Sequence, residues 1–375
     1  MNRTYKTAII GAGINGSTTA YKLKQAGQKV IIFDMNSIAG GGSGSAGAFI
    51  SPKFSKKGEL RELLNDAFIY SMDFYKKEFS EFLTSAPLLH IAQDKKSSET
   101  LAIYKESTKL KMLEPSKELL NSLKPYATEQ ENICLEAGVI DASAICYEMC
   151  KDIEFVKEEV TSLVHSDDYW IINDKYSVKN VVLATGAYKK LLDEPYINLR
   201  GIWGHRIDIK TATKNDYSIH QNVSISPSSD GVLAIGATHN VHYHPQTSTE
   251  PYDIDEGRAE LLEKASRSLD LKDVEVVKDY TGLRSGTVDY IPLLGGLVIS
   301  EKTLQNKTIR FDTKKVDYAK YDYYPNLTMI NGSGGYGFVL APYLAEMLSE
   351  HIINKKEIDK GILPARFFAR WARRR

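Results

Sequence analysis

The chain has 375 residues, with 48 basic and 48 acidic side chains and 42% hydrophobic residues, the composition of an ordinary globular protein. Its length allows one large domain or two moderate ones, and its zero net charge excludes a global attraction to nucleic acid or to an anionic membrane. No apolar run reaches the roughly 18 residues of a membrane span, and the N-terminus lacks a secretory signal, so we expect a cytoplasmic protein.

The first predicted element is a buried strand at Ala8–Ile10, which leads through a glycine-rich turn into a helix. The turn, residues 11–16, has the sequence Gly-Ala-Gly-Ile-Asn-Gly, which is GxGxxG between a strand and a helix. Gly11 permits the tight turn, Gly13 lets the backbone approach a pyrophosphate, and Gly16 lets the helix pack closely on the strand. These features predict a dinucleotide site, and we expect a side chain at Gly13 to exclude the cofactor.

A second predicted strand, Lys29–Phe33, ends at Asp34. An acidic residue at this distance from the glycines binds a ribose hydroxyl and repels a ribose phosphate, which disfavours NADP. The small residues of segment 40–47 follow, and their backbone amides can press against a large flat ligand. Because a flexible linker inside the first βαβ unit would break the sheet, we assign this segment to the cofactor site.

A helix is predicted over Gly58–Leu83, with an apolar stripe that packs against the nucleotide-binding sheet. Three cysteines follow, Cys134, Cys146 and Cys150. Their odd number and the lack of a CxxC pair argue against disulfides, and two thiols without further ligands make a poor metal site. We therefore expect buried thiols in a reducing compartment and no bound metal.

Two further strands run into glycines, at Val181–Leu183 and at Met329–Asn331, and a helix follows the second over Pro342–His351. Between them, strands at Asn222–Ser226 and Val232–Ala237 are joined by Ser-Asp-Gly, which predicts an antiparallel hairpin. A helix over 256–269 comes next. The pattern combines a nucleotide-binding α/β sheet with an antiparallel one.

The three glycine-rich segments, in this order, resemble the superfamily of D-amino-acid oxidase, glycine oxidase and sarcosine oxidase, whose members bind FAD. Residues 282–292, Gly-Leu-Arg-Ser-Gly-Thr-Val-Asp-Tyr-Ile-Pro, are similar to its GLRPxTxDxxP signature, with Ser285 replacing the proline. The resemblance spans nearly the whole chain and implies removal of a hydride from a carbon beside an amine nitrogen. It implies FAD contacts at Gly11, Gly13, Ile14, Asn15, Gly16, Asp34, Gly42, Ser43, Ser45, Ala46, Gly47, Val160, Thr185, Gly186, Gly332, Gly334, Gly335, Tyr336 and Gly337.

Other segments resemble the oxidase domain of the bacterial bifunctional MnmC family, which matures the tRNA wobble uridine. They are Ser51–Ser55, similar to its PKxS segment, Gly236–Thr238, similar to its GAT strand end, and Leu340–Glu346, similar to its APLxAE helix start. This resemblance implies oxidation of carboxymethylaminomethyl-uridine in tRNA to aminomethyl-uridine and glyoxylate. Since the chain begins at the FAD strand, we expect the methyltransferase half of that family to be absent.

The chain departs from these relatives at two positions. Gly335 and Tyr336 stand where the tRNA enzyme and glycine oxidase carry an arginine, and Ser224 stands where glycine oxidase has a substrate-facing tyrosine. These departures weaken the expectation that the site binds a small free amino acid through two side-chain contacts. Arg284 is the predicted clamp for a substrate carboxylate, because a guanidinium offers a planar fork of two donors. Tyr336 is the second catalytic candidate, as a hydroxyl donor over the flavin.

Other patterns leave alternatives open. The loop histidines His239, His242 and His244 lack a carboxylate or thiol motif that would complete a metal site, so a polar loop at the site mouth is the better interpretation. The basic and aromatic tail, 366–375, is either a phosphate-binding face or a helix docked by its aromatics. A second candidate patch for RNA contains Lys314, Lys315, Lys320, Tyr318, Tyr321, Tyr323 and Tyr324.

The elements predict an α/β fold: a discontinuous Rossmann-like FAD-binding domain and a second, α+β substrate domain on an antiparallel sheet. We expect residues 1–83, 138–200 and 282–375 in the first, and 84–137 and 201–281 in the second. FAD is expected to be noncovalent, because no cysteine lies beyond Cys150.

Three functions fit these patterns. The first is a tRNA-modifying amine oxidoreductase. The second is an oxidase or dehydrogenase for glycine, sarcosine or a D-amino acid, and the third is a flavin-bearing regulatory protein without turnover. Arg284 beside the flavin motifs weighs against the third.

Overall fold

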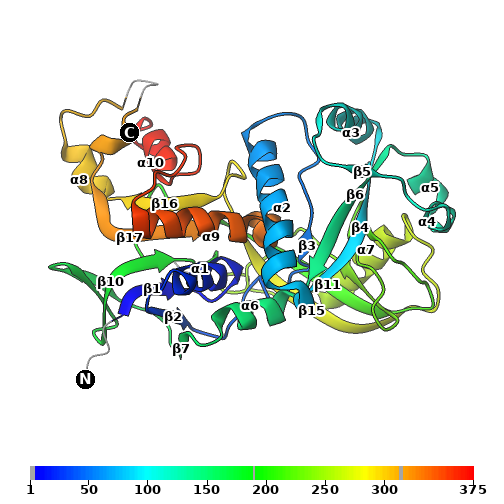
Figure 1. Cartoon of the computed structure of the whole chain (residues 1–375), viewed down its shortest axis with the longest axis horizontal. Helices are drawn as coiled ribbons and strands as arrows, with labels where there is room; N and C mark the ends of the chain where they lie inside the picture. Colours follow the sequence, from blue (N-terminus) through cyan, green and yellow to red (C-terminus); the bar gives the residue numbers. More distant parts are fainter. Residues whose placement is uncertain (1–4, 189–190, 312–315) are drawn as a thin grey trace.

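The computed structural model describes residues 5–188, 191–311 and 316–375, and its ribbon shows two β-sheets side by side (Figure 1). The strands of the first sheet are β1 (Tyr5–Ile10), β2 (Val30–Asp34), β7 (Glu154–Lys157), β8 (Leu163–Ser166), β9 (Tyr169–Ile172), β10 (Tyr176–Leu183), β16 (Leu293–Val298) and β17 (Tyr323–Asn331). Their order is β16-β17-β10-β1-β2-β7, with the β8–β9 hairpin attached to β10.

The centre of the first sheet is parallel. Ile9 of β1 pairs with Ile32 of β2 and with Val182 of β10, and β10 pairs in parallel with β17. Both faces of these strands are buried, which explains their continuous runs of valine, isoleucine and leucine. The three predicted strands that run into glycines are therefore confirmed as neighbours, and their carboxyl ends meet at one edge of the sheet.

Helices cover one face of this sheet. They are α1 (Ile14–Gln25), α6 (Ala142–Cys150) and α9 (Gly337–Asn354), and α2 (Glu59–Glu78) packs against α9. The apolar side chains of all four helices share one core with the strands. The helix predicted over 58–83 ends earlier, at Glu78, because a short turn, η1 (Ser80–Phe82), leads directly into the next strand. The three cysteines are buried as expected, and burial raises the pKa of Cys134 and of Cys150 to about 11.

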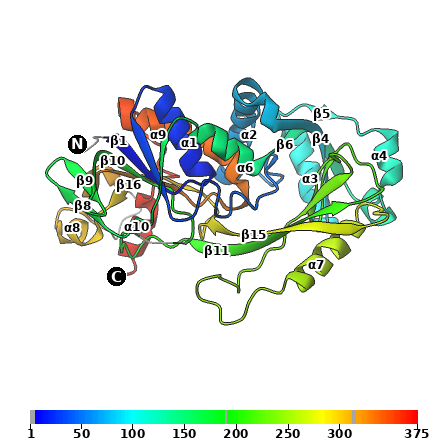
Figure 2. The same cartoon turned by 90° about the horizontal axis from the view of Figure 1, so that it is seen from below.

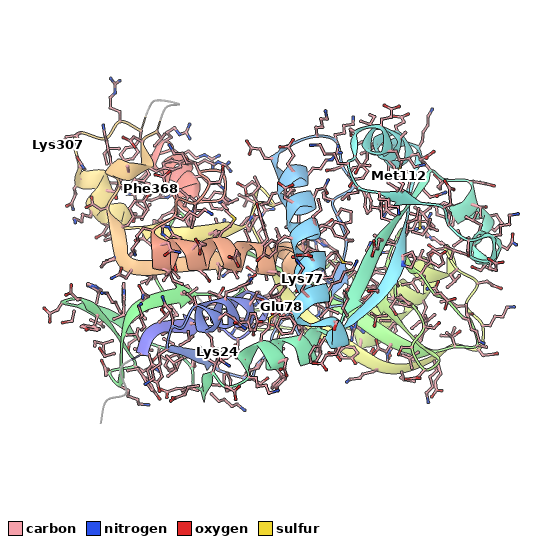
Figure 3. The ribbon with its side chains drawn as sticks, viewed as in Figure 1. Lys24, Lys77, Glu78, Met112, Lys307 and Phe368 are labelled. Atoms are coloured by element: carbon pink, nitrogen blue, oxygen red, sulfur yellow. The ribbon has the colours of Figure 1, made fainter. Side chains whose placement is uncertain are left out.

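The opposite face is covered by the β8–β9 hairpin, by α8 (Ser300–Gln305) and by the C-terminal helix α10 (Ala365–Ala372). Phe368, labelled at α10 in Figure 3, is fully buried against Tyr196 and Tyr321. The tail is thus a docked helix, as one of the two interpretations predicted. No helix in the described ranges is long and apolar enough to cross a membrane.

The second sheet is largely antiparallel. Its strands are β3 (Phe49–Ile50), β4 (Leu83–Ile91), β5 (Met112–Leu113), β6 (Asn132–Ile140), β11 (Arg200–Lys210), β12 (Ser218–His220), β13 (Ser224–Ile225), β14 (Val232–Gly236) and β15 (Glu275–Gly286). They run in the order β15-β11-β14-β13-β12-β4-β6-β3, with β5 on β6. The predicted hairpin is confirmed as β13 and β14.

The two faces of the second sheet differ in chemistry. Helix α7 (Ile254–Ser266) lies below the sheet in Figure 2 and packs Leu261 against Ile207 and Ile235. Residues paired across neighbouring strands project from the same face. One continuous set of such pairs, here named the polar row, projects from the face opposite α7 and consists of Tyr280, Arg206, Gly236, Ser224, His220 and His90.

Three short helices, α3 (Lys95–Ser107), α4 (Lys117–Ser122) and α5 (Pro125–Thr128), lie beyond β4 and β6 (Figure 1). The expected domain boundaries at 137/138 and 281/282 fall inside β6 and β15, and both strands belong to the second sheet over their whole length. The division of the chain into two domains stays a prediction.

Candidate active site

The first glycine-rich turn is fixed by the backbone around it. A Cβ at Gly11, whose φ is +108°, would lie 2.3 Å from the carbonyl oxygen of Ala184, and one at Gly16 would lie 1.9 Å from the carbonyl oxygen of Gly11. Neither position can hold a side chain without moving the main chain. The turn thereby holds the N-terminus of α1 at the carboxyl edge of the sheet, where a helix favours an anion.

The loop of residues 40–47 bonds to the start of this helix. The amide of Ile14 donates to Ser43 Oγ over 2.9 Å, and a Cβ at Gly13 would lie 2.9 Å from the same oxygen. At the end of β2, Asp34 accepts hydrogen bonds from the amides of Ala12 and Asn36, both over 2.9 Å. The carboxylate predicted to bind a ribose therefore has a fixed position beside the turn.

The same loop also presses against the second sheet. A Cβ at Gly42 would lie 2.5 Å from the carbonyl oxygen of Leu283, and Ser45 Oγ donates to the carbonyl of Thr281 over 2.6 Å. Arg206 donates to the carbonyl of Ala46 over 2.9 Å. The loop's small residues are therefore required by the close approach of β15 as well as by the predicted flat ligand.

The last glycine-rich segment lies beside the first glycine-rich turn at the carboxyl edge of the sheet. The space among these two segments and the loop of residues 40–47 is here named the groove. Asn331 accepts a hydrogen bond from Ser285 Oγ over 2.9 Å and donates to the carbonyl of Gly186 over 3.0 Å. Asn15 donates to Ser333 Oγ over 3.1 Å, which ties this segment to α1. The segments that the sequence predicts to bind the cofactor, widely separated along the chain, are thus brought together.

The groove contains the open space that a bound cofactor needs. A Cβ at Gly334 or at Gly335 would meet no described atom within 4 Å, although a Cβ at Gly337 would lie 3.2 Å from Ile14. Gly334 has a φ of +56°, which itself favours glycine. Gly335 is required neither by its backbone conformation nor by a neighbouring atom, and it fits a ligand that lies against the backbone. Val160, by contrast, is buried in the core with Ile31 and Phe33.

Arg284 projects from β15 beside this groove. Its guanidinium lies against Gly204 of β11, where a Cβ would be 2.4 Å from Nη2, and Nη1 donates to the carbonyl of Thr238 over 3.0 Å. No carboxylate of the described residues forms an ion pair with it, and burial lowers the pKa of Arg284. A buried cation without a counter-ion is costly unless an anionic ligand completes the site.

A cavity of about 250 Å³ lies on the polar-row face of the second sheet, between that sheet and Tyr336. Tyr336, the second catalytic candidate, lines it, and Lys53 Nζ is 5.4 Å from the centre of the Tyr336 ring. Four members of the polar row also line the cavity. The complete lining is Ser51, Pro52, Phe54, His90, His220, Gln221, Asn222, Val223, Ser224, Gly236, Ala237 and Tyr336.

The sequence patterns do not point to His90, His220 or Asn222. Each has a buried nitrogen atom without a hydrogen-bond partner among the described groups: Nδ1 of His90, Nε2 of His220 and Nδ2 of Asn222. Burial lowers the pKa of His90 to about 3, with His220 and Lys53 acting in the same direction, and lowers the pKa of His220 to about 4. One signal was present: His90 is polar inside the apolar run Leu88–Ile91.

The other polar clusters lie elsewhere. Tyr243 packs with Trp203 in the histidine-rich loop, and within the described ranges no group of three or more potential ligands could hold a metal. In the C-terminal helix, Arg366 forms an ion pair with Asp289 over 3.1 Å, whereas Arg373, Arg374 and Arg375 are exposed.

The second candidate RNA patch is only partly described. Lys314 and Lys315 fall outside the described residues. Tyr321 is buried, and Tyr324 donates to Glu194 over 2.7 Å, so these two aromatic side chains serve packing.

A groove at the carboxyl edge of a parallel sheet, walled by a second sheet that holds an unpaired arginine, defines the class of dinucleotide-dependent oxidoreductases. Sequence comparison gives the family. The profile of the DAO family, described as FAD dependent oxidoreductase, matches residues 6–351, and the chain belongs to this family.

Individual proteins are also similar to this chain. A tRNA 5-methylaminomethyl-2-thiouridine biosynthesis bifunctional protein MnmC of Campylobacter concisus is 26% identical over 97% of this chain and 60% of its own length. The chain thus spans about three fifths of that relative. The glycine oxidase of Bacillus subtilis is 24% identical, with 79% of this chain and 85% of that protein covered. The crystal structure of glycine oxidase from Bacillus cereus superimposes with a TM-score of 0.74 at 20% identity, over 94% of this chain and 96% of that one.

The protein is therefore an FAD-dependent oxidoreductase of the DAO family with a Rossmann-like FAD-binding fold. The groove fits FAD, because its open space at Gly334 and Gly335 adjoins the N-terminus of α1 and the carboxylate of Asp34. The roles of the individual groove residues remain predictions.

Proposed function

We propose that this enzyme oxidises the carbon–nitrogen bond of an N-substituted glycine, and that its substrate is carboxymethylaminomethyl-uridine at the tRNA wobble position. The two-electron oxidation yields an imine, and water hydrolyses this imine to aminomethyl-uridine and glyoxylate. The similarity to MnmC proteins over nearly the whole chain supports this substrate. A tRNA substrate also favours a cytoplasmic location.

The observation that carries the proposal is the unpaired guanidinium of Arg284. A glycine unit presents a carboxylate one carbon from its amine, and a guanidinium binds a carboxylate through two parallel hydrogen bonds. Because Arg284 is held by Gly204 and the carbonyl of Thr238, its direction is fixed before the substrate binds. Fixed orientation of the reacting carbon is the main contribution that the protein makes to such a reaction.

Bound at the glycine-rich segments, FAD would supply the two-electron acceptor for the hydride that leaves the carbon beside the amine nitrogen. The chain's own residues bind the carboxylate at Arg284 and line the cavity with uncharged groups. Tyr336 places its side chain at this cavity, where its hydroxyl can donate to the substrate. The low pKa values of His90 and His220 leave both rings neutral at pH 7, so neither imidazole competes with Arg284 for the carboxylate.

A small amino acid is the rival substrate, because a glycine oxidase is among the relatives. Anaerobic mixing with the oxidised yellow enzyme separates the two. We expect carboxymethylaminomethyl-uridine in tRNA to bleach the flavin, and glycine, sarcosine and D-alanine to leave it oxidised at equal concentration. Bleaching by the free amino acids and not by the tRNA would establish the rival function.

The control is the same tRNA carrying aminomethyl-uridine, which lacks the carboxymethyl group. It should not bleach the flavin, since it has neither the reacting carbon nor the carboxylate for Arg284. If neither the modified tRNA nor any amino acid reduced the flavin, the protein would bind FAD without turnover on these amines.

A further inference from the structure

Arg284 lies at one end of the cavity, beside Ala237, and is not itself a lining residue. Arg284 bonds to Thr238, which follows the lining residue Ala237 at the end of β14. From β14, strands β12 and β4 lie two and three strand spacings away, which is roughly 10 to 14 Å. A single amino acid spans about 3.8 Å. A glycine with its carboxylate on Arg284 therefore cannot also reach the histidines, and the far part must be filled by what the nitrogen carries.

The side chains that line the far part of the cavity offer hydrogen bonds and carry no charge, and Lys53 lies beside them at Tyr336. The walls of the far part hold two neutral imidazoles and one carboxamide, each with a buried nitrogen that lacks a partner among the described residues. The carboxamide nitrogen of Asn222 can only donate, whereas a neutral imidazole nitrogen donates or accepts according to its tautomer. Buried groups of this kind cost free energy unless a ligand satisfies them.

The far part also has a flat aromatic wall. The rings of Phe54 and His90 are stacked, with centres 4.0 Å apart and planes 10° from parallel, and both line the cavity. The ring of Phe49 meets His220 edge to face at 5.0 Å. These contacts hold the imidazoles rigid, so their unpartnered nitrogens point in fixed directions. Fixed donors and acceptors beside a flat wall suit a planar ring better than a flexible chain.

We propose that His90, His220 and Asn222 form a specificity subsite for the N-substituent of the substrate, and that this substituent is an uncharged planar ring with imide-type donors and acceptors. A pyrimidine base is such a ring. This inference rests on the proposed function, since it assumes a glycine carboxylate on Arg284. It adds the residues that select the group that the glycine nitrogen carries. An apolar ring in this position would leave three buried nitrogens without partners.

Three unreactive probes test the subsite by equilibrium binding. In each, sulfur replaces the amine nitrogen, so the common thioacetate unit keeps its carboxylate but cannot be oxidised as an amine. The probes are uracil-5-ylmethylthioacetate, benzylthioacetate and thiodiacetate, and binding is read from the absorption spectrum of the oxidised holoenzyme. The uracil probe should bind about tenfold more tightly than the benzyl probe, and thiodiacetate should bind most weakly.

Variants assign this preference to residues. His220→Leu and Asn222→Leu should each reduce the preference for uracil over benzyl to about threefold or less and leave the benzyl affinity unchanged, and His220→Gln should restore part of it. His165→Leu is the matched control, because His165 packs on Trp170 in the β8–β9 hairpin. It should keep the full preference. The yellow holoenzyme spectrum reports that each variant is folded.

Equal binding of the uracil and benzyl probes by the wild-type enzyme would overturn the subsite, as would an unchanged preference in both leucine variants. Tightest binding of thiodiacetate would overturn its neutral character. Failure of the proposed function looks different: the Arg284→Ala variant would then bind all three probes as tightly as the wild type.

Discussion

At the scale of single residues, the glycines of the groove fall into two kinds. Gly16 is required by the protein itself, because a Cβ there would overlap the carbonyl of Gly11. Gly335 has no described neighbour within 4 Å of its Cβ position and no left-handed φ. The open space at Gly335 can hold a bound ligand, so a side chain should have different effects at the two positions.

This difference gives a prediction. Gly335→Val should leave the thermal unfolding of the apoprotein unchanged and weaken FAD binding about tenfold or more, because the added side chain occupies the ligand's space. Gly16→Ala should destabilise the apoprotein itself by about 1 to 3 kcal/mol. Flavin titration and calorimetry of the apoproteins measure both effects. Destabilised apoprotein with unchanged FAD affinity in Gly335→Val would show that FAD does not lie there.

At the scale of elements, α7 is fastened to β15 by a polar contact. Asp279 of β15 accepts hydrogen bonds from Arg258 of α7, over 2.9 and 2.5 Å, and from His205 of β11 over 2.9 Å. The hydrogen bond from Arg258 is the main cause that lowers the pKa of Asp279 below its ordinary value of 3.8. The folded state thus binds this proton less readily than the unfolded state.

The contribution of Asp279 to the free energy of unfolding depends on pH. The contribution of Asp279 is complete above its ordinary pKa and is lost as the pH falls through the lower pKa of the folded state. Asp279→Asn should therefore lower the free energy of unfolding by about 1 kcal/mol at pH 7 and by less near pH 3. Denaturant unfolding at both pH values measures this. Asp216→Asn, on an exposed loop, is the control, and an equal loss at both pH values would argue against the ionic contact.

The elements also show which parts of the fold could be predicted from the sequence. The turn around Gly11, Gly13 and Gly16 is specified within a few residues. Its strand, its helix and its class of ligand can therefore be predicted from this short segment alone. The tight contact of Gly42 with Leu283 is different, since it depends on how β15 lies against the loop. Sequence patterns show that a glycine is present but not which surface requires it.

The subsite could not be predicted for a related reason. His90 and His220 become neighbours only because β4 and β12 pair in parallel, and the two strands are far apart in the chain. No short motif encodes such a pairing. The histidines that do cluster in sequence lie instead on a loop beside Tyr243. They are His239, His242 and His244.

At the scale of the whole molecule, the two sheets have different proposed roles, one in cofactor binding and one in substrate binding. The two sheets lie side by side (Figures 1 and 2). In our proposal the parallel sheet binds the cofactor at the ends of β1, β10 and β17, and the antiparallel sheet binds the substrate through Arg284 and the polar row. This arrangement predicts that cofactor binding and substrate binding can be lost separately.

The rate of anaerobic flavin reduction in the Arg284→Ala variant tests this account most directly. The variant should purify with FAD and keep its yellow colour, because Arg284 lies outside the glycine-rich segments. Arg267→Ala, at the exposed residue that follows α7, should behave as the wild type. With limiting modified tRNA, Arg284→Ala should reduce its flavin about 100-fold more slowly, since the loss of two charged hydrogen bonds removes the carboxylate's anchor. Reduction at the wild-type rate would contradict the central claim that this guanidinium holds the substrate.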